Sequence, residues 1–455
     1  MFSRIEVYLP SRLSAAWRLP SVLLTACLAW ASVIVPAHAV PSFSRQTGST
    51  CADCHVGSFG PQLTPFGMTF KLNGYTLTNG GEGHIPLSAM VQSSYEKLNT
   101  APADGSKQHT AEFAQQASLF LAGRMTDHIG AFIQATGTGE HGTFKVPTLA
   151  QDNADIRYAD TFTLGGKSSV VGVSLNNNPT VSDVFNTVPA WRFPYIGPTL
   201  TPGANASPLL DGGLGAQVWG LNAYTLVDNT WYAELGGYMP QSRSFLESTN
   251  VLAPGDPYNK LSGVNPYWRF AYMGNVGGGT VTAGVFGLNA RITPDGLTAK
   301  DKYNDIGVDG SYQLPVGKND ILAVNGAYMH EKQTLDATFA NAGSDNASNT
   351  LHRFDLSASY YFDQTYGLTL GTSRIGGTSD TTLYGGDPTT NSYILQADWT
   401  PFGKAGSWGS PWANVRLGLQ YTWFTKLNGL TNSDNGGGPK ASDSNTLYAF
   451  VWTSF

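Results

Sequence analysis

The chain has 455 residues, of which only 13% are charged and 12% are aromatic, and it contains 53 glycines. Its formal net charge is −6 and it has no basic block, which excludes nucleic acid as a partner. After the N-terminal 40 residues no run of about 20 apolar residues occurs, so the sequence also excludes a membrane-spanning helix.

Residues 1–39 are predicted to be a signal peptide. Three arginines precede the apolar run SVLLTACLAWASVIV, which is followed by Pro36 and by the small-residue tripeptide AHA that ends at Ala39. This three-part pattern is typical of secretory signals, with cleavage after Ala39. A membrane anchor fits less well, because the apolar run is short and Pro36 breaks a helix. Cleavage removes Cys27 and leaves two cysteines in the mature chain.

The two remaining cysteines, Cys51 and Cys54, lie in the stretch STCADCH, which ends at His55. C-x-x-C-H is the attachment motif of c-type haem: the thiols form thioether bonds to the two vinyl groups, and the histidine is held under the iron as the proximal ligand. A thiol oxidoreductase site is less consistent with the chain, because no thioredoxin-like βαβ unit is predicted. A zinc site needs four ligands, and no second pair occurs at matching spacing. The motif predicts one covalent haem c.

Residues 40–86 carry this motif and form the predicted monohaem cytochrome c segment. So short a segment cannot build an independent core without a cofactor or another surface on which to pack. We therefore expect this segment to pack against the rest of the chain, which would form part of the walls of the haem site.

The rest of the chain, residues 87–455, alternates in polarity with a period of two. In VRLGLQYTW the apolar residues share one face and the polar residues share the other, and RFDLSASYYF and YILQADWT show the same division. Such alternation over about ten residues is typical of transmembrane β-strands, although a soluble β-sandwich shows it too.

The links between strands favour the barrel. Short turns alternate with long loops rich in Gly, Asn, Asp and Pro, as in outer-membrane barrels. Only the link around SWGSPW breaks this alternation, because it stands at the position of a short turn but is longer. The chain ends in an aromatic-terminated strand, LYAFVWTSF, like the C-terminal assembly signal of bacterial outer-membrane proteins. We predict about 16 strands, at approximately residues 87–97, 115–124, 128–137, 153–164, 168–176, 213–226, 229–239, 265–274, 279–288, 304–314, 319–330, 351–362, 366–374, 390–400, 413–424 and 446–455.

A barrel of about 16 strands encloses an aqueous lumen that can hold a plug. We therefore predict an all-β, antiparallel transmembrane barrel in the outer membrane of a Gram-negative bacterium, surrounded by outer-membrane lipid. The haem-bearing segment is expected to plug or cap the lumen at its periplasmic side.

The chain resembles the fused monohaem cytochrome–porins of bacterial outer membranes in three stretches: VPSFSRQTGSTCADCH, PQLTPFGMTFKLNGYTL and NNNPTVSDVFNTVPAWRFPY. The resemblance implies that Cys51, Cys54 and His55 hold the haem. It also implies an oxidoreductase in the electron-transfer sense, which takes electrons from extracellular Fe(II) and passes them to a periplasmic cytochrome or another carrier. Ser44 and Asp53 depart from the small apolar residues expected at their positions.

Several residues are candidates for the sixth position on the iron. Met68, His84 and Met90 lie near the motif in the sequence, and His109 is more remote. A methionine ligand raises the potential relative to a histidine, which suits an acceptor of electrons from iron and favours Met68. However, a methionine among aromatics, as in TPFGMTF, is more often a packing residue. We lean towards His84, because the glycine-rich stretch GGEGHIP can reach back towards a haem.

Arg45 is a candidate partner of a haem propionate, because its guanidinium can hold a carboxylate with two hydrogen bonds. A solvated arginine explains this residue equally well. Four apolar side chains of the segment are expected to line the porphyrin faces, namely Phe59, Leu63, Phe66 and Leu72.

The sequence contains no recognisable donor site. Loop acids are scattered without metal-ligand spacing, and His330 with Glu331 is best explained as a solvated pair at the barrel rim. Three functions are compatible with the chain: oxidation of Fe(II), an electron conduit for another donor or for an extracellular acceptor, and a diffusion porin with a haem-bearing plug.

Overall fold

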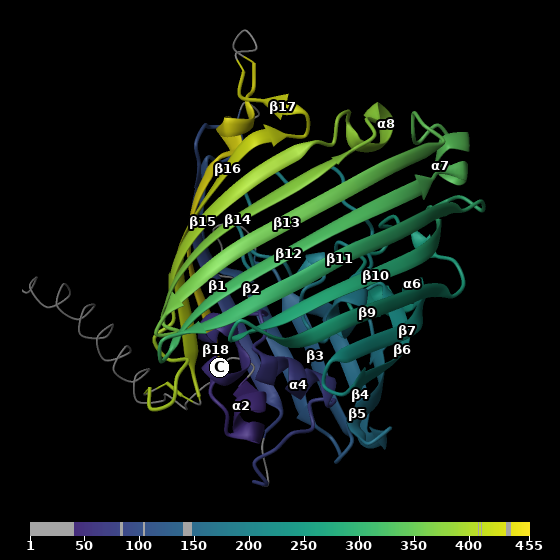
Figure 1. The fold of residues 1–455 in the computed structure, drawn as a ribbon. Coiled ribbons are helices and arrows are strands. Elements are labelled where there is room, and N and C mark those ends of the chain that lie inside the picture. The colour runs from purple at the N-terminus through teal and green to yellow at the C-terminus, as the bar shows by residue number, and fades with distance from the viewer. Residues whose placement is uncertain are drawn as a thin grey trace, which may run out of the picture.

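The computed structural model describes residues 41–81, 85–102, 105–139, 148–407, 409–410, 412–433 and 438–455. The predicted signal peptide, residues 1–39, and His84 lie outside the described residues. The described strands form one antiparallel sheet of 18 strands, of which two contain only two residues each, which leaves sixteen long strands. The first and last strands pair along their length, from Met90 opposite Ser454 to Leu98 opposite Thr446. The sheet is therefore a closed barrel, as predicted (Figure 1).

The strand bounds follow the predicted ones closely. The long strands are β1 (Leu87–Leu98), β2 (His109–Arg124), β3 (Ile129–Gly137), β4 (Ala150–Leu164), β5 (Lys167–Asn176), β6 (Val218–Val227), β7 (Trp231–Pro240), β9 (Asn265–Val276), β10 (Gly279–Thr293), β11 (Asp301–Val316), β12 (Asp320–Thr334), β13 (Ser348–Phe362), β14 (Tyr366–Gly377), β15 (Thr390–Trp399), β16 (Asn414–Leu427) and β18 (Thr446–Ser454). The two short strands are β8 (Lys260–Leu261) and β17 (Leu430–Thr431). The predicted strand 213–226 begins late, because turns occupy residues 209–217 and Ala216 has a φ of 59°.

The helices are short and lie in the segment that precedes β1 or in the links between strands. They are α2 (Pro41–Thr47), α3 (Cys51–Cys54), α4 (Pro65–Leu72), α5 (Pro179–Ser182), α6 (Arg243–Ser248), α7 (Asp336–Ala340), α8 (Thr381–Tyr384) and the 3-10 turns η1 (Val56–Ser58), η2 (Pro189–Trp191) and η3 (Ala441–Ser444). Within the described ranges, no helix has the length and apolar character that a membrane crossing requires.

The predicted alternation separates a lipid-facing surface from a polar interior. On β13, four outward residues are 36% to 58% exposed, namely Phe354, Leu356, Tyr360 and Phe362. Their inward neighbours are at most 6% exposed, namely Arg353, Asp355, Ser357 and Ser359. Apolar side chains outside and polar side chains inside are the pattern of a barrel that sits in lipid.

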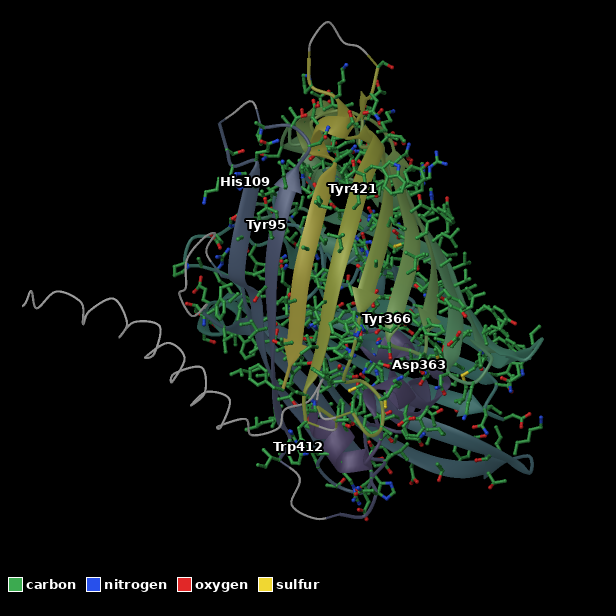
Figure 2. The ribbon with its side chains drawn as sticks, turned by 90° about the vertical axis from the view of Figure 1, so that its left-hand side faces the viewer. Tyr95, His109, Asp363, Tyr366, Trp412 and Tyr421 are labelled. Atoms are coloured by element: carbon green, nitrogen blue, oxygen red, sulfur yellow. The ribbon has the colours of Figure 1, made fainter. Side chains whose placement is uncertain are left out.

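Aromatic residues flank the apolar surface at both ends. Figure 2 shows Tyr95 and Tyr421 towards one end of the barrel and Tyr366 and Trp412 towards the other. All four side chains are exposed, at 37% to 54%. Two such girdles mark the interfaces where a transmembrane barrel meets water.

The two ends of the barrel differ. Six links between consecutive long strands have two to four residues, and antiparallel order places them all at one end, here called the short-turn end. The other end, the long-loop end, carries α7, α8 and β17, whereas α2 and α4 lie at the short-turn end (Figure 1). Residues 41–81, here called the plug segment, contact two links at the short-turn end. The Ser58 hydroxyl donates to the Gln364 carbonyl in the short β13–β14 turn at 2.8 Å, and the Ala52 N–H donates to the Gly403 carbonyl in the longer β15–β16 link at 2.9 Å.

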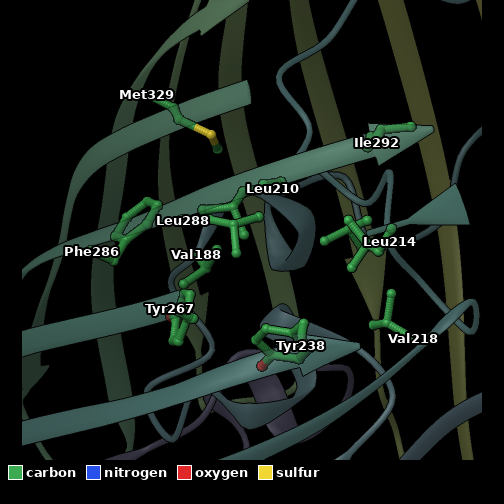
Figure 3. Packing of buried hydrophobic residues seen from close by; sticks show 12 residues of the cluster. Val188, Leu210, Leu214, Val218, Tyr238, Tyr267, Phe286, Leu288, Ile292 and Met329 are labelled. Carbon is green, nitrogen blue, oxygen red and sulfur yellow. The ribbon is translucent and has the colours of Figure 1, made fainter. Parts of the chain in front are cut away.

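Residues 177–217, here called the lumen loop, connect β5 to β6 and fold inwards. Val188, Leu210 and Leu214 are at most 5% exposed and form one apolar cluster with inward side chains of the wall, including Tyr267 and Phe286 (Figure 3). The lumen loop and the plug segment also touch, since the Lys71 ammonium donates to the Asp183 carbonyl at 2.7 Å. The lumen is therefore filled from two parts of the chain.

Arg416 on β16 joins the plug segment to the wall. Its guanidinium is 1% exposed, pairs with the Asp398 carboxylate at 3.2 Å and donates to the Gly57 carbonyl at 3.1 Å. It also lies over the Phe59 ring, 5.7 Å from the ring centre. A buried charge of this kind is stabilising only while all of its partners are in place.

We expect Arg416→Ala to destabilise the folded protein by about 3–5 kcal/mol, because it leaves the Asp398 carboxylate buried without its partner. Urea unfolding measures this loss, and limited proteolysis should cut the plug segment sooner than in the wild type. Arg374→Ala, at an exposed arginine of β14, is the matched control and should change stability by less than about 0.5 kcal/mol. Equal stability of the two variants would contradict the role of Arg416.

Candidate functional site

The motif residues are positioned by α3, a single helical turn. The Thr50 N–H donates to the Asp53 carboxylate at 2.6 Å, and the Thr50 hydroxyl donates to the same carboxylate at 2.8 Å. The His55 N–H then donates to the Cys51 carbonyl at 2.8 Å and closes the turn. Asp53 thus fixes the start of the helix that presents both cysteines.

Cys51, Cys54 and His55 border one cavity of about 360 Å³ inside the lumen. The size falls within the range of small-molecule and cofactor sites, about 300–1,000 Å³. The plug segment forms one wall, strands β1 to β4 and β18 form a second, and the lumen loop forms a third through residues such as Trp191, Arg192 and Tyr195. The structure therefore brings the three motif residues together at one partly open cavity.

The donor atoms at this cavity suit covalent haem attachment. The two cysteines are not joined in a disulfide. The His55 Nδ1 atom is buried without a hydrogen bond of good geometry. Burial lowers the pKa of His55 to about 4, although the nearby carbonyls of Gln62 and Gly60 oppose the shift. A neutral imidazole is the form that can bind a metal, so the cavity is bordered by two thiols and by an imidazole that could hold haem iron.

The thiol of Cys54 is protonated at neutral pH. Burial raises its pKa to about 12, with smaller contributions from Asp53 and Cys51. A reactive redox thiol has a lowered pKa and an electropositive setting. The Cys54 environment therefore does not favour a thiol oxidoreductase. Nor do the described residues contain any group of three His, Cys, Asp or Glu side chains arranged to hold a metal ion.

The cavity is apolar towards the short-turn end and polar towards the long-loop end. On β2 and β3 the lining residues Phe120 and Phe132 are nearer the short turns, and Gln116 and Gln134 are nearer the long loops. Arg192 of the lumen loop also lines the cavity and pairs with Asp211 at 2.6 Å. An amphiphilic planar group with carboxylates on one edge, such as haem, fits a cavity divided in this way.

The other predicted site residues are placed differently. Arg45 does not border the cavity: its guanidinium donates to the Ile85 carbonyl at 2.9 Å and also to the Leu87 carbonyl. Met68 is 3% exposed, packs with Leu72 and other apolar residues, and does not itself border the cavity, although Leu63 of the same cluster does. The proposed roles of Arg45 with a propionate and of Met68 on the iron are not supported by these positions.

Two more ligand candidates lie at different heights of the barrel wall, since Met90 is opposite Ser118 and His109 is opposite Lys97 in the pairing of β1 with β2. Met90 borders the cavity from β1. His109 lies towards the long-loop end (Figure 2), so it is remote from the motif. Of the apolar residues expected to line the porphyrin, Phe59 and Leu63 border the cavity, whereas Phe66 is 40% exposed.

The interpretation of His330 and Glu331 as a solvated rim pair is wrong. Neighbouring strand residues point to opposite faces, and Glu331 is fully buried inside the lumen. Its carboxylate accepts a hydrogen bond from the Leu209 N–H at 2.7 Å. The lumen loop was not predicted to be part of the site, although the stretch NNNPTVSDVFNTVPAWRFPY contains cavity-lining residues such as Trp191 and Tyr195.

These features define a class of protein. A closed barrel of sixteen long antiparallel strands, an apolar outer surface between two aromatic girdles and short turns at one end are the architecture of porin-like outer-membrane proteins of Gram-negative bacteria. The predicted fold class and localisation are confirmed.

Comparisons with known proteins add little to this assignment. No protein-family model matches the chain, and no curated protein matches it. Among solved structures, OmpF of Salmonella typhi in complex with daunomycin is 15% identical with a TM-score of 0.46, over 81% of this chain and 97% of that chain. The anion-selective porin from Comamonas acidovorans is 12% identical with a TM-score of 0.44, over 81% and 98%. Values this low carry no argument, and the assignment depends on the geometry of the chain itself.

We expect Gly67→Ala to disrupt the cavity, because a Cβ atom at Gly67 would lie 2.3 Å from the Cys54 carbonyl oxygen. Relieving this overlap must separate α4 from α3, at a cost of about 1–3 kcal/mol. Urea unfolding should record the loss. Gly197→Ala in the lumen loop is the matched control, since no atom lies within 4 Å of its Cβ position and its φ is not in the left-handed region. If the stability of Gly67→Ala equalled that of the wild type, α3 and α4 would not be in tight contact at this position.

Proposed function

We propose that the chain is an outer-membrane electron-transfer protein that carries one c-type haem in the lumen of its barrel. The observation that carries the proposal is that Cys51, Cys54 and His55 border the same cavity inside the barrel. When bound, the haem supplies reversible one-electron chemistry between Fe(III) and Fe(II).

The residues of the chain have separate tasks in this proposal. Cys51 and Cys54 anchor the porphyrin through thioether bonds, and His55 donates its imidazole nitrogen to the iron. Phe59, Phe120 and neighbouring apolar side chains exclude water from the porphyrin faces. The polar end of the cavity receives the propionates, and Arg192, which borders the cavity, is better placed to balance their charge than Arg45.

Extracellular Fe(II) is the proposed donor. Each Fe(II) loses one electron at the long-loop side and leaves as Fe(III), and a one-electron carrier, such as a periplasmic cytochrome, gains that electron at the short-turn side. The donor is carried over from the resemblance to the cytochrome–porins. Outer-sphere transfer needs close approach and a favourable potential difference, so it does not require a tight iron site.

The position of the plug segment and the lumen loop favours electron transfer, and not the passage of solutes, as the function of the barrel. Both fold into the lumen and contact each other, and strongly buried residues such as Val188 and Tyr75 lie where an open channel would pass. A lumen filled in this way limits the access of water to a redox centre and leaves the short-turn end available to a carrier.

Mixing the oxidised protein rapidly with Fe(II) should shift its haem absorption bands to those of the reduced state. Cys51→Ser with Cys54→Ser should abolish covalent haem, seen as loss of haem staining on a denaturing gel. Ascorbate is the control reductant. If ascorbate reduces the haem and Fe(II) does not, the protein would still be an electron conduit, but Fe(II) would not be its donor. Absence of haem from the wild type would refute the proposed function.

A diffusion porin with a plug is the second candidate, because the porin-like barrel and its polar lumen wall suit that function equally well. In planar bilayers we expect a variant lacking residues 41–81 to conduct more than the wild type, because the deletion removes one of the two parts of the chain that fill the lumen, while the lumen loop remains. Equal, high conductance of the two proteins would instead favour the porin.

A further inference from the structure

We infer that Met90, on the barrel wall, is the second axial ligand of the iron that His55 also binds. The inference deepens the proposed function and rests on it, because it requires a haem in the cavity. His55 reaches the cavity from the plug segment, and Met90 reaches it from the inner face of β1. Among the described residues that border the cavity, these are the only histidine and the only methionine.

The surroundings of Met90 direct its side chain into the cavity. The residues opposite it on the two neighbouring strands are serines, Ser118 on β2 and Ser454 on β18. Both serines are short and buried, so the methionine thioether extends beyond its cross-strand neighbours. Met90 is 7% exposed and shares an apolar cluster with Phe59 and Trp452, which keeps water away from the sulfur.

Four other side chains at the cavity can in principle bind iron, namely Lys71, Tyr75, Asp152 and Tyr195. Each is already engaged. The Asp152 carboxylate accepts hydrogen bonds from the Thr136 hydroxyl at 2.7 Å and from the Asn153 amide at 3.0 Å. The Lys71 ammonium donates to the Asp183 carbonyl at 2.7 Å, and the Tyr75 hydroxyl donates to the Asp155 carboxylate at 2.6 Å. The Tyr195 hydroxyl donates to Gln62 at 3.3 Å. The thioether of Met90 is neutral and needs no such partner, so binding iron costs it no hydrogen bond.

The alternative methionine points elsewhere. Met68 packs with Leu72, Phe185 and Tyr224 in a cluster that includes the wall of β6, and it does not border the cavity. Moving its sulfur to the cavity would require α4 to rotate and the cluster to open.

A wall-borne methionine also suits the proposed direction of electron flow. A thioether ligand raises the haem potential relative to a second histidine, and a high potential is what an acceptor of electrons from Fe(II) needs. It further means that the plug segment and the barrel each supply one ligand, so the coordination sphere is complete only when the plug is seated.

The test is spectroscopic and does not depend on activity. Oxidised wild-type protein should show a sulfur-to-iron charge-transfer band in the near infrared by absorption and magnetic circular dichroism. Met90→Leu should lose this band and convert the low-spin spectrum to high-spin. Met90→His should keep a low-spin spectrum, lose the band and lower the midpoint potential. Met68→Leu is the matched control and should retain both the band and the potential.

A wild-type spectrum without the band would overturn the inference whatever the variants do, as would a Met90→Leu protein that keeps it. Loss of the low-spin spectrum in His84→Ala, with the Met90→Leu spectrum unchanged, would assign the position to His84 instead. Haem staining separates the two hypotheses: covalent haem without the band refutes the Met90 ligand alone, whereas absence of haem refutes the proposed function and with it this inference.

Discussion

The structure depends on how the charged wall of the lumen is neutralised. Sixteen long strands enclose a space too wide for wall side chains to fill, and three inward arginines, Arg157, Arg269 and Arg416, are at most 2% exposed. Each pairs with a wall carboxylate. Each arginine also binds a residue that lies inside the lumen. Arg416 donates to the Gly57 carbonyl of the plug segment. Arg157 donates to the Ser182 carbonyl of the lumen loop, and Arg269 pairs with the Asp183 carboxylate of the same loop. Because a buried unpaired charge costs several kcal/mol, the wall and its contents stabilise one another.

This mutual dependence explains how a segment of about 40 residues maintains a defined site. The plug segment has three short helices of its own, α2, α3 and α4, and little else to bury them against. The barrel supplies a rigid wall with fixed register, and the lumen loop covers the remaining side. The cavity lies where these three parts meet, so its shape is set by contacts between residues that are far apart in the sequence.

The strands were predictable because their signals are local. Alternation with a period of two and the spacing of turns depend on neighbouring residues, and they placed all sixteen long strands close to their observed bounds. The motif from Cys51 to His55 is equally local. The lumen loop was not predictable, because its composition resembles that of the outer loops and only long-range packing folds it inwards. Glu331 was misjudged for a related reason: the face of a strand-end residue depends on register.

The closure of the barrel sets an order for its assembly. The seam joins β1, which follows the plug segment directly, to β18, the last strand of the chain. The sheet therefore cannot close until β18 has been exported, so the plug segment leaves the cell interior before the lumen that it fills exists. This order leaves a period in which a group can be attached covalently to the plug segment before the hydrogen bonds of the seam form around it.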